Sequence, residues 1–234
     1  MQPEYLDRLG ASLQSFVREV EQAAAVDIQV VCVDEPNDTL GVVIAAPTCE
    51  LRIPKNRRYF LDGAVRHEVL HVKRFLLDRV PMLELADAEE PDDDPLAAEL
   101  RDLDNAIEHV LIVPEEIRFH PERRQHWEEV MGRACVGLCC MPAVDRAYAL
   151  CMHWTFLRSV LPGSPAIEVA REFAMKHALL ELAIRFEEDF LSLATSKEEL
   201  VRLVLCRFPH IPKNRAAFRY VNSITRSAYT TPIE

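Results

Sequence analysis

Glycine is scarce in this sequence of 234 residues, and its six glycines form no phosphate-binding loop. Neither the GxGxxG spacing nor the GxxxxGK spacing occurs, which argues against the common nucleotide-binding folds. The chain also lacks a run of about 18 uncharged apolar residues, the length needed to cross a bilayer. Its N-terminus has no basic segment followed by an apolar one, so we expect no secretory signal, no membrane association and a cytoplasmic location.

Cysteine is present in an odd number, seven, and no two cysteines have the CxxC spacing. In a chain without an export signal, these residues are expected to be reduced thiols rather than a disulfide framework. The missing CxxC pairs also argue against the usual thiolate zinc clusters. The sequence therefore predicts neither disulfides nor a metal cluster of that kind.

Basic residues are outnumbered, since 27 Lys and Arg face 38 Asp and Glu and the net charge is −11. Seven of the acidic residues lie between Pro81 and Pro95, a segment without Lys or Arg that is expected to be a solvated loop. The rest of the chain carries a charge of only −4. Such a balance gives no general attraction to phosphate backbones, so we expect no nucleic-acid partner.

The pattern of apolar residues predicts an α+β fold. Residues 3–25 have helical spacing, and residues 27–33, 40–46 and 50–53 follow as strands of a small, mainly antiparallel sheet. Further helices are predicted over residues 57–80, 94–113, 143–161, 165–194 and 197–207. Ser196 followed by Lys197-Glu198-Glu199 fits a capping box at the start of the last of these helices.

The most informative segment is His67-Glu68-Val69-Leu70-His71, an HExxH motif within a predicted helix. Residues four apart lie on one face of an α-helix, so both imidazoles can reach one metal ion. Glu68 lies at the edge of this face, where it can take a proton from a water molecule whose pKa the ion lowers to about 7. The motif predicts a catalytic zinc site with His67 and His71 as ligands and Glu68 as the general base. The alternative is an ordinary solvent-facing pair of histidines.

A catalytic zinc ion needs a third protein ligand, which we expect in the next predicted helix, residues 94–113. Glu108 is the favoured candidate, because mostly apolar residues surround it in the sequence and a metal ion would stabilise its charge there. Asp104 precedes it by four residues and shares its face, where it could orient a ligand. Asp104 and His109 are the alternative third ligands.

Three features around the HExxH motif resemble a known group of enzymes. A pattern of strands precedes the motif, the segment Arg57-Arg58-Tyr59-Phe60 begins its helix, and the next helix contains Asn105-Ala106-Ile107 followed by Pro114. Together they resemble the zincin-type metallopeptidases. More narrowly, they are similar to the ImmA/IrrE-type family, whose second helix carries an Asn-Ala-Phe…Leu-Met-Pro stretch. The similarity covers residues 27–118, about half of the chain.

This resemblance implies a gluzincin-type zinc peptidase with His67 and His71 as ligands and Glu68 as the general base. It does not assign the third ligand, because the family usually has glutamates where this chain has Arg101-Asp102-Leu103-Asp104. We therefore expect a zincin-like core over residues 1–118, with a small, mainly antiparallel sheet and an active-site helix. A helical C-terminal region over residues 119–234 is expected to pack on this core.

The expected activity is hydrolysis of peptide bonds in a protein or peptide substrate, with Zn²⁺ as the cofactor. Glu50–Ile53 is predicted to be an edge strand that pairs with an extended substrate. The candidates for stabilising the oxyanion are His120, His126, Tyr148 and Tyr59. The alternative function is a catalytically silent zincin-fold module that regulates or binds another protein.

Overall fold

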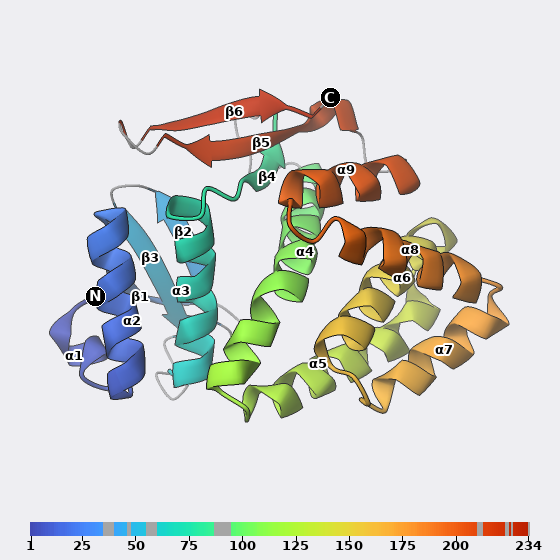
Figure 1. Ribbon diagram of the computed structural model, residues 1–234, viewed down its shortest axis with the longest axis horizontal. Helices are drawn as coiled ribbons and strands as arrows, with labels where there is room; N and C mark the ends of the chain where they lie inside the picture. The colour runs from blue at the N-terminus through green and yellow to red at the C-terminus, as the bar shows by residue number, and fades with distance from the viewer. Residues whose placement is uncertain are drawn as a thin grey trace. The chain divides into compact units, whose positions relative to one another are not determined.

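The computed structural model describes residues 1–34, 40–45, 48–54, 60–86, 95–209, 213–222, 225 and 227–233. These residues form an α+β fold, as predicted, with many helices and two small three-stranded sheets (Figure 1). The chain divides into two compact units, Met1–Met82 with Arg219–Thr230, and Leu83–Phe218 with Thr231–Glu234. The predicted domain boundary at residue 118 lies within the second of these units rather than between them.

The first two helices, α1 (Pro3–Leu6) and α2 (Ala11–Ala24), are separated by a break where one helix over residues 3–25 was expected. Gly10 lies at the break with an extended backbone, and its N–H donates a hydrogen bond of 2.8 Å to Asp62 Oδ2. A Cβ at this position would lie 2.8 Å from the same oxygen, so a larger residue here would displace the Asp62 carboxylate from this hydrogen bond. Beyond it, apolar residues at helical spacing bury one face of α2: Leu13, Val17, Val20 and Ala24.

The first unit contains the predicted three-stranded sheet, formed by β1 (Asp27–Val33), β2 (Gly41–Ala45) and β3 (Thr48–Pro54). Its order is β1-β3-β2, with β3 antiparallel to β2 but parallel to β1. The prediction of a mainly antiparallel sheet is therefore wrong for one of the two pairings. Only two residues separate β2 from β3, which favours an antiparallel pair, whereas β1 joins the opposite side of β3.

The central place of β3 means that the prediction of Glu50–Ile53 as an edge strand is wrong. The outer side of β1 is closed by side chains. Val30 N–H donates to Gln2 Oε1 (2.8 Å), and Gln2 Nε2 donates back to Val30 O (3.2 Å). Ile28 N–H donates to Glu21 Oε1 (2.9 Å). These bonds occupy backbone groups that an additional strand would need, so β2 is the edge left for strand pairing among the described residues.

Helix α3 (Asp62–Leu76) carries the HExxH motif and packs against α2 and β2 (Figure 1). Its apolar residues recur at helical spacing and join the core formed with α2 and the sheet: Val65, Val69, Val72, Phe75 and Leu76. The helix ends before Arg79, whose φ of 58° is left-handed. Of the helix predicted over residues 57–80, residues 57–59 lie outside the described residues.

Helices dominate the described part of the second unit. They are α4 (Pro95–Phe119), α5 (Arg123–Gly137), α6 (Ala143–Val160), α7 (Ala166–Lys176), α8 (Leu180–Ser192) and α9 (Lys197–Arg207), with short 3₁₀ turns η1 (Leu138–Cys140) and η2 (Lys213–Arg215). The predicted helix over residues 165–194 is two helices, because Ala178 has a left-handed φ of 56°. Helix α5 occupies a stretch for which no element was predicted. Helix α9 begins where predicted, with Glu199 N–H donating to Ser196 Oγ at 3.3 Å.

Helix α4 is longer than predicted, because it continues through Pro114 to Phe119 instead of ending at Val113. A proline inside a helix removes one backbone hydrogen bond and crowds the preceding turn. The following turn is nevertheless held in place, since the buried Glu116 accepts hydrogen bonds from Arg123 and Trp127 of α5. These bonds come from another helix, which is why the local sequence does not reveal them.

A second sheet has the order β4-β5-β6 and was not predicted. Its strands are β4 (Met82–Leu85), β5 (Ala216–Val221) and β6 (Ala228–Pro232). Strand β6 lies in a short polar run of residues, and such a run does not reveal its pairing with β5. The acidic segment, expected to be a loop, begins with β4, and its residues 87–94 lie outside the described residues.

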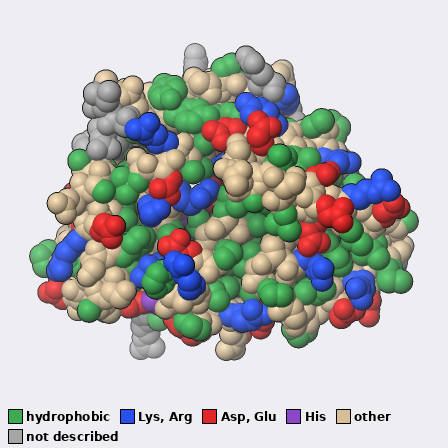
Figure 2. Space-filling view, in the orientation of Figure 1, with side chains coloured by type: hydrophobic (Ala, Val, Ile, Leu, Met, Phe, Trp, Pro, Cys, Tyr) green, Lys and Arg blue, Asp and Glu red, His purple; other side chains and the backbone are tan. Residues whose placement is uncertain are grey.

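The surface carries both signs of charge. On the face shown in Figure 2, Lys and Arg side chains are interspersed with Asp and Glu rather than gathered in one patch. Within the described residues, no helix combines the length and the apolar character that crossing a membrane requires.

Candidate metal centre

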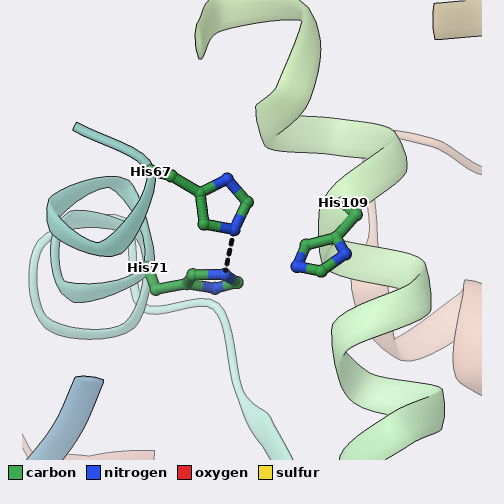
Figure 3. Close-up of side chains that lie close together, drawn as sticks. All are labelled: His67, His71 and His109. Carbon is green, nitrogen blue, oxygen red and sulfur yellow. Dashed lines mark hydrogen bonds between the residues drawn. The ribbon is translucent and has the colours of Figure 1, made fainter. Parts of the chain in front are cut away.

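The two histidines of the HExxH motif lie on one face of α3, one turn apart, as the four-residue spacing predicts. Their Nε2 atoms face each other at 3.3 Å, and the ring planes are nearly perpendicular at 77° (Figure 3). His67 is buried, with 6% of its surface exposed, and His71 is half-buried. Both rings are therefore largely shielded from water and directed at a common point.

The separation of these nitrogens fits two ligands of one tetrahedral ion. Zinc binds imidazole nitrogens at about 2.0–2.1 Å, so the tetrahedral angle places two such nitrogens about 3.3–3.4 Å apart. The observed separation is 3.3 Å. A direct N–H···N hydrogen bond between the two rings is the other interpretation, and 3.3 Å is at the long end of the range for hydrogen bonds from nitrogen donors. The pair can thus bind one metal ion without a change in the distance between the nitrogens.

Glu68 follows His67 on α3 and is half-buried. Successive residues are rotated by about 100° around a helix, so Glu68 lies about 60° from His71 and at the edge of the histidine face. This is the position expected for a group that exchanges a proton beside the ion without binding it. Its role as the general base stays a prediction.

The predicted third ligand, Glu108, lies in the second unit beside a buried lysine. Lys197 Nζ, at the start of α9, is 3.0 Å from Glu108 Oε1 and 2.8 Å from Asp104 Oδ1. Asp104 Oδ1 also accepts the N–H of Leu83 at 2.8 Å. All three charged side chains are buried, with 3–7% of their residue surfaces exposed. Burial raises the pKa of Asp104, and the ammonium of Lys197 opposes that rise.

This cluster offers another explanation for a carboxylate in apolar surroundings. The sequence argument for Glu108 was that a buried charge needs a cation, and Lys197 supplies one. Sequence reasoning missed Lys197 because it lies far along the chain, at the first position of a helix, where lysines are usually solvated. Coordination of a metal by Glu108 stays a prediction, but the structure gives its charge a partner within the same unit.

His109, the alternative third ligand, is half-buried on α4. It lies about 100° around the helix from Glu108, away from the edge that Lys197 contacts. Its ring packs edge-to-face against Trp127 of α5, with centroids 5.1 Å apart. An imidazole nitrogen is a common ligand of zinc.

The structure does not select one of the four candidates for stabilising the oxyanion. Tyr59 lies outside the described residues. Tyr148 packs against Phe208, and burial, reinforced by Asp102, raises its pKa. His120 Nδ1 is 3.4 Å from Glu122 Oε1, and the ring of His126 lies 5.5 Å from that of Trp127. The role of these residues stays a prediction.

Comparisons with known proteins do not assign the chain to a family. No protein-family model matches the sequence, and searches of curated proteins and of solved structures found no significant match either. The resemblance to zincins and to the ImmA/IrrE-type family therefore stays a prediction from the motifs. Function has to be inferred from the side chains themselves.

Proposed function

We propose that this protein is a zinc-dependent metallopeptidase in which His67 and His71 are two of the three protein ligands. The observation that carries the proposal is the 3.3 Å separation of the two Nε2 atoms, which equals the spacing of two ligands on a tetrahedral zinc ion. Nothing in the HExxH helix has to rearrange to reach that spacing. A helix on which the two histidines pointed apart would not support the same conclusion.

In the proposed reaction, Glu68 accepts a proton from the attacking water and delivers it to the leaving amine. A bound zinc ion would acidify that water and polarise the scissile carbonyl. Glu68 is half-buried at the edge of the face that carries the two histidines. An extended peptide would pair with β2, because β3 is central and side chains close the outer side of β1.

For the third ligand we favour His109 over Glu108 and Asp104. Both carboxylates already contact Lys197, and withdrawing either toward a metal would leave the buried ammonium less well compensated. The proposal therefore joins His67, His71 and His109 in one metal site.

Glu68→Gln tests the catalytic half of the proposal. This change keeps the size of the side chain but removes the base, so zinc should stay at one equivalent while hydrolysis of an unstructured protein substrate falls by about 10²-fold or more. Glu188→Gln on α8 is the matched control and should change neither quantity. A wild-type protein that holds zinc but hydrolyses no peptide would favour the alternative, a catalytically silent binding module.

The third ligand is tested by comparing His109→Ala with Glu108→Gln. The alanine variant should lose zinc affinity as strongly as a change at His67, whereas Glu108→Gln should keep zinc and lose stability instead. Metal content after dialysis against a weak chelator, together with an unfolding curve, measures both effects. The reverse pattern would restore Glu108 as the ligand.

A further inference from the structure

The indole of Trp127 forms one wall of the space occupied by the His109 ring. The two rings meet edge-to-face, at 62° and with centroids 5.1 Å apart. The indole is itself held on other sides, because its Nε1 donates a 3.0 Å hydrogen bond to Glu116 Oε2 and its ring contacts Phe156. With 7% of its surface exposed, Trp127 has little freedom to move. The imidazole therefore packs against a fixed aromatic surface.

Glu116 anchors this arrangement. Its side chain is fully buried, and a carboxylate in that position is stable only when it is paired and hydrogen-bonded. Arg123 Nε donates to Oε1, while Trp127 donates to Oε2, so each oxygen has a donor of its own. Rotation of the carboxylate would break one bond or the other. The orientation of the indole is thus coupled to an ion pair that water scarcely reaches.

Helical spacing explains why these four side chains meet. His109 and Glu116 are seven residues apart on α4 and share one face, and Arg123 and Trp127 are four apart on α5 and share another. The carboxylates that contact Lys197 lie on a different edge of α4. One helix therefore carries two separate polar systems, one turned toward α9 and the other toward α5.

We propose that Trp127 is the positioning residue for His109, fixing its imidazole in the orientation that binds the metal ion. This inference depends on the proposed function, because it concerns a histidine assigned there as a ligand. Groups that orient a metal ligand are typically worth 10–100-fold in metal affinity. Here the orienting contact is aromatic packing against the indole, and Glu116 with Arg123 holds the indole in place.

A spectroscopic experiment tests the contact without altering it. The chain has two tryptophans, so Trp154→Phe leaves Trp127 as the single emitter, and Trp127→Phe leaves only Trp154. Cu²⁺ quenches tryptophan emission at short range. One equivalent of Cu²⁺ should quench Trp154→Phe strongly, and the added change His109→Ala or His67→Ala should abolish this quenching. The Trp154-only protein should be quenched much less.

An affinity measurement separates positioning from simple core packing. Trp127→Leu removes the aromatic wall and should weaken zinc binding by about 10–100-fold, measured by chelator competition on protein shown by circular dichroism to be folded. Trp127→Phe keeps a ring against His109 and should restore affinity to within about threefold of wild type. A residue that only fills the core would lower the unfolding midpoint in both variants and leave zinc affinity unchanged.

The outcomes distinguish this inference from the proposed function. If wild type binds zinc through His67 and His71 but neither Trp127 emission nor Trp127→Leu affinity responds, the positioning role is overturned and the zinc site stands. If His109→Ala loses zinc while Trp127→Leu binds it normally, His109 is a ligand that needs no positioning by the indole. If wild type binds no zinc, both proposals fall. Should Trp127→Leu not fold, the quenching of the Trp154→Phe protein decides alone.

Discussion

Two pairs of ionisable side chains share the same four-residue helical spacing but have different surroundings. On α3, His67 and His71 direct their Nε2 atoms at each other across 3.3 Å. On α4, Asp104 and Glu108 both contact the ammonium of Lys197, at 2.8 and 3.0 Å. The carboxylate pair receives its cation from the chain itself, whereas an imidazole can bind a metal ion through a ring nitrogen without carrying a negative charge. The four-residue spacing identifies side chains that share a helix face. Their chemical type and the charged groups that contact them determine whether they can bind a metal ion.

The largest effect is expected on zinc affinity when one histidine of the pair is removed. His67→Ala or His71→Ala removes one of three proposed protein ligands, so zinc affinity should fall by more than the 10–100-fold that loss of an outer-shell partner costs. Chelator competition measures the change. His177→Ala, at the C-terminal end of α7, removes a histidine of the second unit and should leave zinc affinity unaltered. Full metal content in both motif variants would place the site elsewhere.

Removing the ammonium of Lys197 from Asp104 and Glu108 should lower the stability of the protein without changing its metal content. Lys197→Met leaves two buried carboxylates without their ammonium, which should lower the free energy of unfolding by about 3–5 kcal/mol. Adding Asp104→Asn and Glu108→Gln removes the uncompensated charge, so the triple variant should recover most of that loss. Urea unfolding curves measure both. A Lys197→Met protein as stable as wild type would show that the ion cluster contributes little.

The sequence predicts features encoded locally and misses those made by distant partners. The HExxH face of α3 and the start of α9 at Lys197 follow from residues within one or two turns. The parallel β1–β3 pairing and the strands β4, β5 and β6 depend on segments that meet only after folding. Local rules even misled at Pro114, where contacts from α5 stabilise a helix that the proline alone would end.

The candidate site shows the same division. His67 and His71 could be paired from the motif alone, and their observed contact agrees. For Glu108, the sequence correctly indicated a buried carboxylate that needs a cation, but it could not show that Lys197 provides one. Likewise, nothing near His109 in the sequence points to Trp127, which belongs to the next helix. A single sequence does not reveal which distant residue contacts a buried side chain.

His153 provides a comparison between the histidines proposed as metal ligands and a histidine packed in the helical unit. His153 of α6 is partly buried, and its Nδ1 has no hydrogen-bond partner in the described part of the chain. Burial lowers its pKa from 6.5 to about 4. The unfolded chain then takes up a proton before the folded one, so stability should fall as the pH drops from about 6.5 to 4, by up to about 3 kcal/mol.

The contribution of His153 is isolated as the difference in unfolding free energy between wild type and His153→Gln, followed across that pH range without metal. Titration of other groups, Asp104 among them, cancels in the difference. The gap between the two proteins should change with pH below about 6.5 and level off below about 4. Parallel stability curves would mean that His153 is solvated enough to charge in the folded state.

The smallest expected effect concerns the residue that precedes Lys197. Ser196 Oγ accepts the N–H of Glu199 at 3.3 Å and so satisfies one of the unpaired donors at the start of α9. Ser196→Ala should cost about 1 kcal/mol of stability, and Ser196→Gly only a few tenths, because glycine leaves the helix end open to water. If the cap also holds Lys197 against its carboxylates, the cost of Ser196→Ala should shrink in the Lys197→Met background. Equal costs in the two backgrounds would show that the cap stabilises α9 alone and that the buried ammonium is placed by Asp104 and Glu108 themselves.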